Sequence, residues 1–202
     1  MTTFVFATEC PDILPSASSW ELVTNTRIFQ SPLTNAIKTA GRKGSHWKIS
    51  LSFDNLSGED RANMQAFLAS LEGQEHRFKI KDHSFTRRGT GTTTGWTSDS
   101  SPASSGNTLR LQNSGTVTTT IAKGDYISVD NQLFMATATA TCTAASELSI
   151  TVSPEVRSLT AGQSAELVNP TGVFILTGST GWDTRPGIIS SFRLDAVEDV
   201  LA

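Results

Sequence analysis

Three side chains used in hydrolytic chemistry stand next to one another at Asp82-His83-Ser84. A Ser–His–Asp relay is assembled from separate segments, because its three side chains must point toward one another. Adjacent residues of an extended chain point to alternating faces, so this tripeptide does not meet that requirement. It is typical of polar turn residues at the end of a strand. A small hydrolase that uses His83 and Ser84 is therefore the weakest functional hypothesis for this chain.

Residues that could bind a metal or a phosphate show no functional spacing. The soft metal ligands are few and scattered: Cys10, His46, His76, His83 and Cys142. None of them has the spacing of a zinc site. The glycines at 89, 91 and 95 lack the Lys-Ser/Thr of a phosphate-binding loop and do not match the dinucleotide fingerprint. We therefore expect no enzymatic activity, no cofactor and no metal.

Two tryptophans, Trp96 and Trp182, each follow a glycine in a segment without periodicity. Exposed loop tryptophans act as sugar platforms or interface anchors. They serve equally well as lids folded over the open end of a small barrel. With Tyr126 as a third aromatic, the first reading gives an alternative function: a carbohydrate-binding module that recognises host surface glycans.

The clearest structural pattern lies between Gly44 and Ile80. Residues 44–53 alternate large apolar with polar side chains, which predicts a strand with one buried face. Residues 57–72 predict a helix, with Ser57 at its N-cap and Gly73 as its left-handed stop. Its apolar face consists of Met64, Phe67, Leu68 and Leu71. Residues 77–80 resume an alternating strand, so this segment predicts a strand–helix–strand core with the only helix of the chain.

The preceding residues predict an extended arm followed by strands. Two prolines in residues 1–15 favour an extended arm of the kind that reaches a neighbouring subunit, with a disordered tail as the alternative. Residues 20–30 predict one strand, and residues 37–40 continue the meander. Residues 41–44 predict a basic hairpin turn into the next strand.

The rest of the chain predicts an inserted module. Residues 86–105 predict a long loop, and short strands then follow at regular spacing with a hairpin at Asp130-Asn131, which is typical of a small barrel or sandwich. We expect residues 84–157 to form this inserted β-barrel module. Residues 1–83 and 158–202, including strands at 165–168, 173–177 and 188–197, then form the first domain. The fold class is mainly β with one α-helix.

Composition limits the partners of the protein. A net charge of −3 and a pI near 5.6 give no electrostatic footprint for nucleic acid. No apolar run approaches the length of a membrane span, and residues 1–12 lack the features of a signal peptide. We expect synthesis in a cytosol, with Cys10 and Cys142 free and buried.

Several segments together resemble the small tail-tip proteins of long-tailed, non-contractile bacteriophages (siphophages). They include residues 20–26, 29–34, 44–47, 66–73 and 77–78, and continue through Arg88-Gly89, Gly124-Asp125-Tyr126 and residues 153–157. The resemblance spans most of the chain and contains no catalytic motif. Members of this group are distal tail or minor tail proteins.

This resemblance implies a structural component of the virion tail tip, made in the host cytoplasm. It implies an antiparallel β belt domain that forms a ring, usually a hexamer, between the tail tube and the hub, baseplate and fibres. Expected partners are other copies of the chain, the tail tube and hub proteins, and the tape measure protein or fibres. The residues that we expect in the core or at interfaces are Trp47, Phe67, Leu71, Phe78, Trp96 and Trp182.

Overall fold

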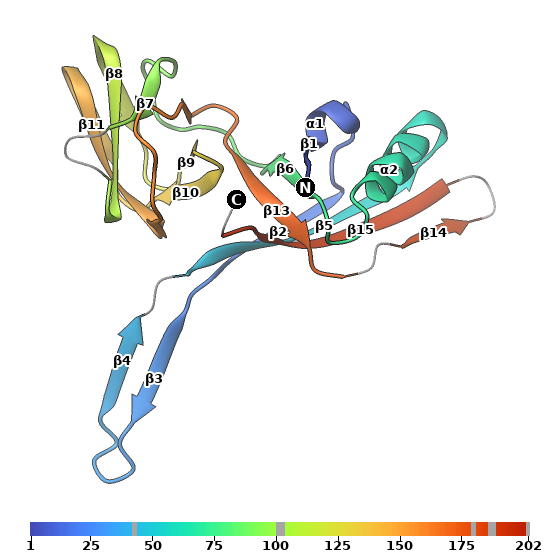
Figure 1. Cartoon of the computed structure of the whole chain (residues 1–202), viewed down its shortest axis with the longest axis horizontal. Helices are drawn as coiled ribbons and strands as arrows, with labels where there is room; N and C mark the ends of the chain where they lie inside the picture. The colour runs from blue at the N-terminus through green and yellow to red at the C-terminus, as the bar shows by residue number, and fades with distance from the viewer. Residues whose placement is uncertain (42–43, 100–103, 179–180, 186–188, 201–202) are drawn as a thin grey trace.

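The computed structural model describes residues 1–41, 44–99, 104–178, 181–185 and 189–200. Within these residues the protein is mainly β, with two sheets, a projecting hairpin and two helices (Figure 1). Pairing within the sheets is antiparallel except where β1 runs parallel to β6. The coarse prediction of a mainly β fold is confirmed.

A seven-stranded sheet forms the larger part of the molecule. Its strands are β1 (Thr3–Val5), β2 (Ala17–Val23), β5 (His46–Leu56), β6 (Arg77–Lys81), β13 (Thr171–Leu176), β14 (Trp182–Arg185) and β15 (Ile189–Glu198). Their order is β1-β6-β13-β15-β5-β2, with β14 paired to β15. The C-terminal strands β13 and β15 lie inside this sheet, as the sequence predicted. They separate β5 from β6, so the strands that flank the helix in sequence are not neighbours in the sheet.

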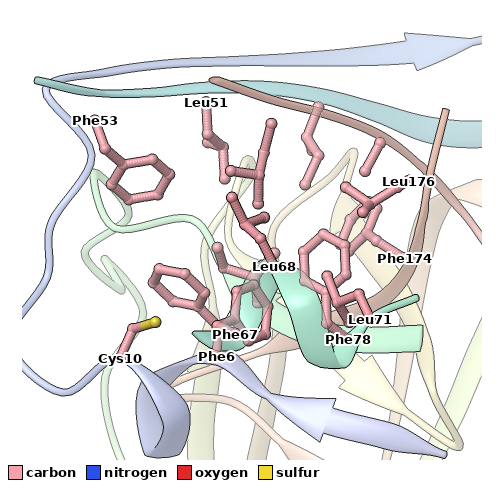
Figure 2. Close-up of a cluster of buried hydrophobic side chains, with 14 of the residues drawn as sticks. Phe6, Cys10, Leu51, Phe53, Phe67, Leu68, Leu71, Phe78, Phe174 and Leu176 are labelled. Carbon is pink, nitrogen blue, oxygen red and sulfur yellow. The ribbon is translucent and has the colours of Figure 1, made fainter. Parts of the chain in front are cut away.

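Helix α2 (Gly58–Ser70) lies where the sequence placed it and covers one face of this sheet. Met64, Phe67, Leu68 and Leu71 are all buried, because helical spacing puts them on one side. Ser57 occupies the N-cap position but makes no side-chain cap hydrogen bond. Gly73 has the expected positive φ of 69°. Figure 2 shows side chains of β5 and of the two helices meeting in this core.

The N-terminal segment is part of the core, and the prediction that residues 1–15 form an extended arm is wrong. Strand β1 adds to the edge of the sheet beside β6, and a second helix, α1 (Phe6–Glu9), follows it. Phe6, Cys10 and Ile13 are buried, with the Phe6 ring edge-on to Phe67 at 5.3 Å between centroids. A partner surface within the same chain therefore fixes this segment, and the prediction of one helix is corrected to two.

A second, six-stranded sheet curls into a nearly closed barrel. Its strands, in spatial order, are β12 (Ala165–Glu166), β9 (Tyr126–Val129), β10 (Gln132–Ala136), β11 (Ala140–Val156), β8 (Gly106–Ile121) and β7 (Trp96–Ser98). The ends approach through a bridge between Thr97 and Ser164 and a 2.8 Å hydrogen bond from the Ser98 amide to the Gln163 carbonyl. The barrel interior holds a separate cluster of buried apolar side chains.

Several strand assignments change in the barrel. Strand β12 pairs with β9, so residues 165–166 do not belong to the first sheet as predicted. The short strands predicted at 108–111 and 116–121 form one long strand, β8, and those at 138–143 and 148–153 form β11 with bulges. The predicted hairpin between β9 and β10 is present, with Asp130 and Asn131 both at positive φ. That geometry matches the right-handed twist of the flanking strands.

Strands β3 (Thr26–Gln30) and β4 (Ile37–Gly41) form a separate two-stranded hairpin that projects from the body (Figure 1). We call residues 26–41 the arm. The strand predicted for 20–30 is divided into β2 and β3, and the chain reverses at 31–36. The hairpin turn predicted at 41–44 includes residues 42–43, which lie outside the described residues. In the described part of the chain, β4 and β5 on its two sides do not pair with each other; they pair with β3 and β2.

Candidate functional site

Most residues that the sequence singled out as core or interface candidates lie in the two cores. Trp47, Phe67, Leu71 and Phe78 are at most 3% exposed and belong to the core under the seven-stranded sheet. Trp96 is 1% exposed and fills the barrel, donating its indole N–H to the Thr92 carbonyl at 3.0 Å. Trp96 is therefore not an exposed platform, and Tyr126 at 9% exposure is not one either.

Trp182 differs from these residues because it is 45% exposed. It begins β14, and its ring lies 6.1 Å from that of Phe192. A depression of about 340 Å³ beside it is lined by Ser52, Asp54 and Arg193, among others. Trp182 is the candidate aromatic that remains available for contact with another molecule.

The Asp82-His83-Ser84 segment forms a local turn. One carboxylate oxygen of Asp82 accepts hydrogen bonds from the Ser84 amide at 2.9 Å and the Ser84 hydroxyl at 2.6 Å. The His83 ring instead packs edge-on against Phe6. Burial lowers the pKa of His83, with a smaller contribution from Lys81. The three side chains do not form a relay, in agreement with the turn interpretation.

A group of possible metal ligands lies in the turn after α2. Oxygen or nitrogen atoms of Glu72, Glu75 and His76 approach one another within 4.8 Å. Both glutamates are exposed, and the Thr2 amide donates to His76 Nδ1 at 3.5 Å. Exposed carboxylates in a turn are common without a metal, so this group does not identify a metal site.

The two sheets meet at a buried polar group centred on Glu198, which sequence reasoning did not single out. Its carboxylate accepts hydrogen bonds from the Trp47 amide at 3.0 Å and the Leu133 amide at 3.4 Å, and pairs with Arg157 at 2.5 Å. The Trp47 indole N–H donates to the Leu133 carbonyl at 2.9 Å. Because these residues come from β5, β10, β15 and the segment after β11, the group ties the barrel to the seven-stranded sheet.

Asp125 holds the long loop before the barrel. Its buried carboxylate accepts the amides of Arg88, Gly89 and Ala122 at 2.8–3.0 Å. At Gly91, with φ of 87°, an added Cβ would collide with the Thr118 carbonyl, so the loop packs tightly along β8. The loop predicted at 86–105 is thus pinned over residues 88–92, and its later part contains β7; residues 100–103 lie outside the described residues.

The arm is the part of the described chain that exposes large apolar side chains in a group. Ile28, Phe29, Leu33 and Ile37 are 68%, 56%, 94% and 63% exposed. All ten residues of β3 and β4 are exposed. Apolar surface gathered on a projecting element marks an interaction site in soluble proteins. The sequence predicted strands here but not a projecting arm. The alternation of apolar and polar residues is the same in a strand that is covered by its own chain and in one that is not.

Cys10 and Cys142 are free and buried, as predicted. Burial raises the pKa of the Cys10 thiol to about 12, helped by the nearby Glu9 carboxylate. In the described residues no helix combines the length and the apolar character needed to cross a membrane. No protein-family model matches the chain, and a search of curated proteins finds no significant match.

Proposed function

We propose that this chain is a structural, ring-forming subunit of the tail tip of a long-tailed, non-contractile bacteriophage. In this proposal the seven-stranded sheet and the arm form the belt of a ring, hexameric by the resemblance stated above. The ring connects the tail tube to the hub, baseplate and fibres in the virion, and catalyses no reaction. The barrel stands as a module attached to the belt.

The arm is the observation that carries this proposal. Four large apolar side chains on a two-stranded hairpin remain in water in the single chain. A two-stranded hairpin is marginally stable by itself, so covering its faces in an assembly stabilises both the arm and the contact. Burying one such side chain contributes about 1.5–3 kcal/mol. Arms of this kind suit subunits that hold on to a neighbour.

The first test removes apolar surface from the arm while keeping its strands. We expect the wild-type chain to form a concentration-dependent oligomer, seen as a ring in negative-stain images and by mass photometry. Ile28→Thr combined with Ile37→Thr keeps β-branched residues and should weaken association about tenfold for each side chain, since each loses about 1.4 kcal/mol of burial.

The matched control for the arm variant is Val168→Thr, which changes an exposed side chain of the body. Both variants should keep the unfolding temperature close to that of the wild type, because the altered side chains are exposed in the single chain. A wild-type protein that stays monomeric, and also fails to bind tail-tube or hub protein, contradicts the proposed function. A tape-measure gene directly upstream would support the assignment to a tail tip.

A second candidate function is glycan recognition, favoured by the exposure of Trp182 beside Asp54 and Arg193. An aromatic face with neighbouring polar groups is a suitable surface for a sugar ring. On a glycan array, a wild-type signal that Trp182→Ala abolishes and Val168→Thr preserves would support it. The absence of a wild-type signal, or a signal unchanged in Trp182→Ala, removes this candidate.

A further inference from the structure

The two faces of the arm differ in chemistry. Directly opposed residues of an antiparallel pair share a face, and Phe29 is opposite Lys38 while Arg27 is opposite Ala40. One face therefore carries both cations of the arm together with the Phe29 ring. The other face is neutral and aliphatic, with Ile28 opposite Thr39 and Ile37 opposite Gln30. A hairpin with these two faces selects a partner surface by charge as well as by apolar contact.

The arm and the residues next to it carry a charge opposite to that of the rest of the chain. Residues 25–44 contain four cationic side chains and no acidic one. The net charge of −3 thus includes +4 from this segment and leaves −7 on the remainder. Within the described residues, Arg27 and Lys38 of the arm form no ion pair. The arm therefore presents its cations to an outside partner.

Six acidic residues of the body are exposed on the two helices or in the turns that follow them, a region that we call the α1–α2 side. Helices α1 and α2 contact each other, and both contact or cover the same sheet (Figure 1). The exposed acids of this side are Glu9, Asp12, Glu59, Asp60, Glu72 and Glu75. Over the described parts of the chain, none of the six has a cationic partner within 4.0 Å, although Arg61 also lies on α2.

Apolar side chains accompany these acids. Val5 and Leu14, on either side of α1, are 42% and 67% exposed. The α1–α2 side thus offers carboxylates without a cationic partner in the described residues and, next to α1, two exposed apolar side chains. This matches the face of the arm that combines Phe29 with Arg27 and Lys38. The two surfaces complement each other in both charge and apolar character.

We propose that the cationic face of the arm of one copy docks on the α1–α2 side of a second copy. In Figure 1 the arm points away from α1 and α2, so an arm does not reach the α1–α2 side of its own chain. The contact joins two different surfaces, which makes the association head-to-tail. Head-to-tail contacts build closed rings when the rotation between copies closes, and open filaments when it does not.

This inference rests on the proposed ring-forming function and names the partner surface within it. A charge-reversal exchange tests it with the full-length chain. Arg27→Glu with Lys38→Glu should weaken self-association at least about tenfold, and Glu72→Lys with Glu75→Lys should do the same. In a mixture of these two double variants, both contacts between unlike copies join opposite charges, so hetero-association should return. A chain that carries all four substitutions should again self-associate close to the wild-type level.

Two controls accompany the exchange. Glu147→Lys with Glu155→Lys, on β11 of the barrel, changes the net charge by the same amount as Glu72→Lys with Glu75→Lys. We expect this control to leave self-association unchanged. Raising sodium chloride from about 0.1 M to about 1 M shortens the Debye length from about 10 Å to about 3 Å and should weaken the wild-type contact. Circular dichroism and thermal unfolding verify that each variant is folded.

The outcomes separate this inference from the proposed function. Restored association in the four-substitution chain supports the contact. A wild-type oligomer that ignores both reversals, or reversals that weaken it without rescue in the four-substitution chain, overturns the contact but leaves the ring-forming function standing. If the arm reversal abolishes binding to a tail-tube protein without changing self-association, the arm belongs to that partner and the inference is wrong. A wild-type monomer at every concentration overturns both.

Discussion

At the scale of single residues, Glu198 joins the two sheets through a carboxylate with no exposed surface on its side chain. Two amides and Arg157 surround it. Burial raises the pKa of Glu198 nevertheless, because loss of water disfavours the charged form more than Arg157 and the amides favour it. The folded protein thus binds a proton at Glu198 more tightly than the unfolded chain does.

We therefore predict that Glu198→Gln lowers the free energy of unfolding. The amide NH₂ replaces an acceptor oxygen and leaves a buried donor unpaired, which should lower the free energy of unfolding by about 1–3 kcal/mol at neutral pH. The contribution of the Glu198 proton to stability is complete below the unfolded pKa and is lost as the pH rises through the higher folded pKa. The stability difference between wild type and variant should therefore widen as the pH is lowered from neutrality.

Urea unfolding across this pH range measures the difference directly. The exposed Glu147→Gln on β11 is the matched control, because it makes the same carboxyl-to-amide change on the surface. If the difference in the free energy of unfolding between wild type and Glu198→Gln became smaller toward low pH, the prediction would be wrong. Attraction to Arg157 would then lower the pKa of Glu198 more than burial raises it.

At the scale of elements, α2 is the element that local sequence describes most fully, and its packing depends on aromatic contacts. The Phe67 ring lies edge-on to Phe6 at 5.3 Å and to Phe78 at 5.8 Å between centroids. These contacts join α1 and α2 to β6 through a layer of aromatic rings, and Figure 2 labels Phe6, Phe67 and Phe78. The N-terminal segment is held in the core by this layer rather than extending to a neighbour.

Phe67→Ala should destabilise this layer strongly. Removing a fully buried Phe costs about 3–5 kcal/mol, through lost burial and the cavity left behind. For a chain of this size the unfolding temperature should fall by about 2–4 °C for each kcal/mol. Ala66→Ser, on the exposed side of the same helix, is the control and should change the temperature little.

The assembly of Phe67→Ala is informative as well. Loosening α2 disturbs the α1–α2 side, so under the proposed function we expect self-association to weaken together with stability. Mass photometry well below the unfolding temperature separates the two effects. A protein that melts early yet assembles like the wild type would show that α2 does not support the ring contact.

At the scale of the whole molecule, strands β9 and β10 of the barrel pack against the core of the seven-stranded sheet. Ile127, Val129 and Phe134 face the barrel core, whereas Tyr126 and Leu133 pack in the core of the first sheet. Both faces of these strands are therefore buried, and the two sheets form one body. The arm lies outside this body, with apolar side chains and a charge opposite to that of the rest. Such a separation of surfaces suits a subunit whose contacts are made between copies.

Local sequence determined the helices and strands in which the spacing of apolar residues shows directly which face is buried. The spacing of Met64, Phe67, Leu68 and Leu71 gave the face of α2, because a helix repeats every 3.6 residues regardless of its partner. The alternation of Phe192, Leu194 and Ala196 gave the buried face of β15 in the same way. Asp130-Asn131 gave the tight turn of the barrel hairpin, because both residues tolerate positive φ.

The tertiary structure decided what depends on distant partners. Phe6 is buried by Phe67 and Phe53, whereas the arm stays exposed because none of the described residues covers it, although both segments show similar short apolar patterns. The Asp82-His83-Ser84 segment is settled as a turn by the hydrogen bonds of Asp82. Glu198 is drawn between the sheets by partners 41 to 151 residues away in sequence. Period and turn chemistry are local, whereas burial, exposure and charge pairing are properties of the folded chain.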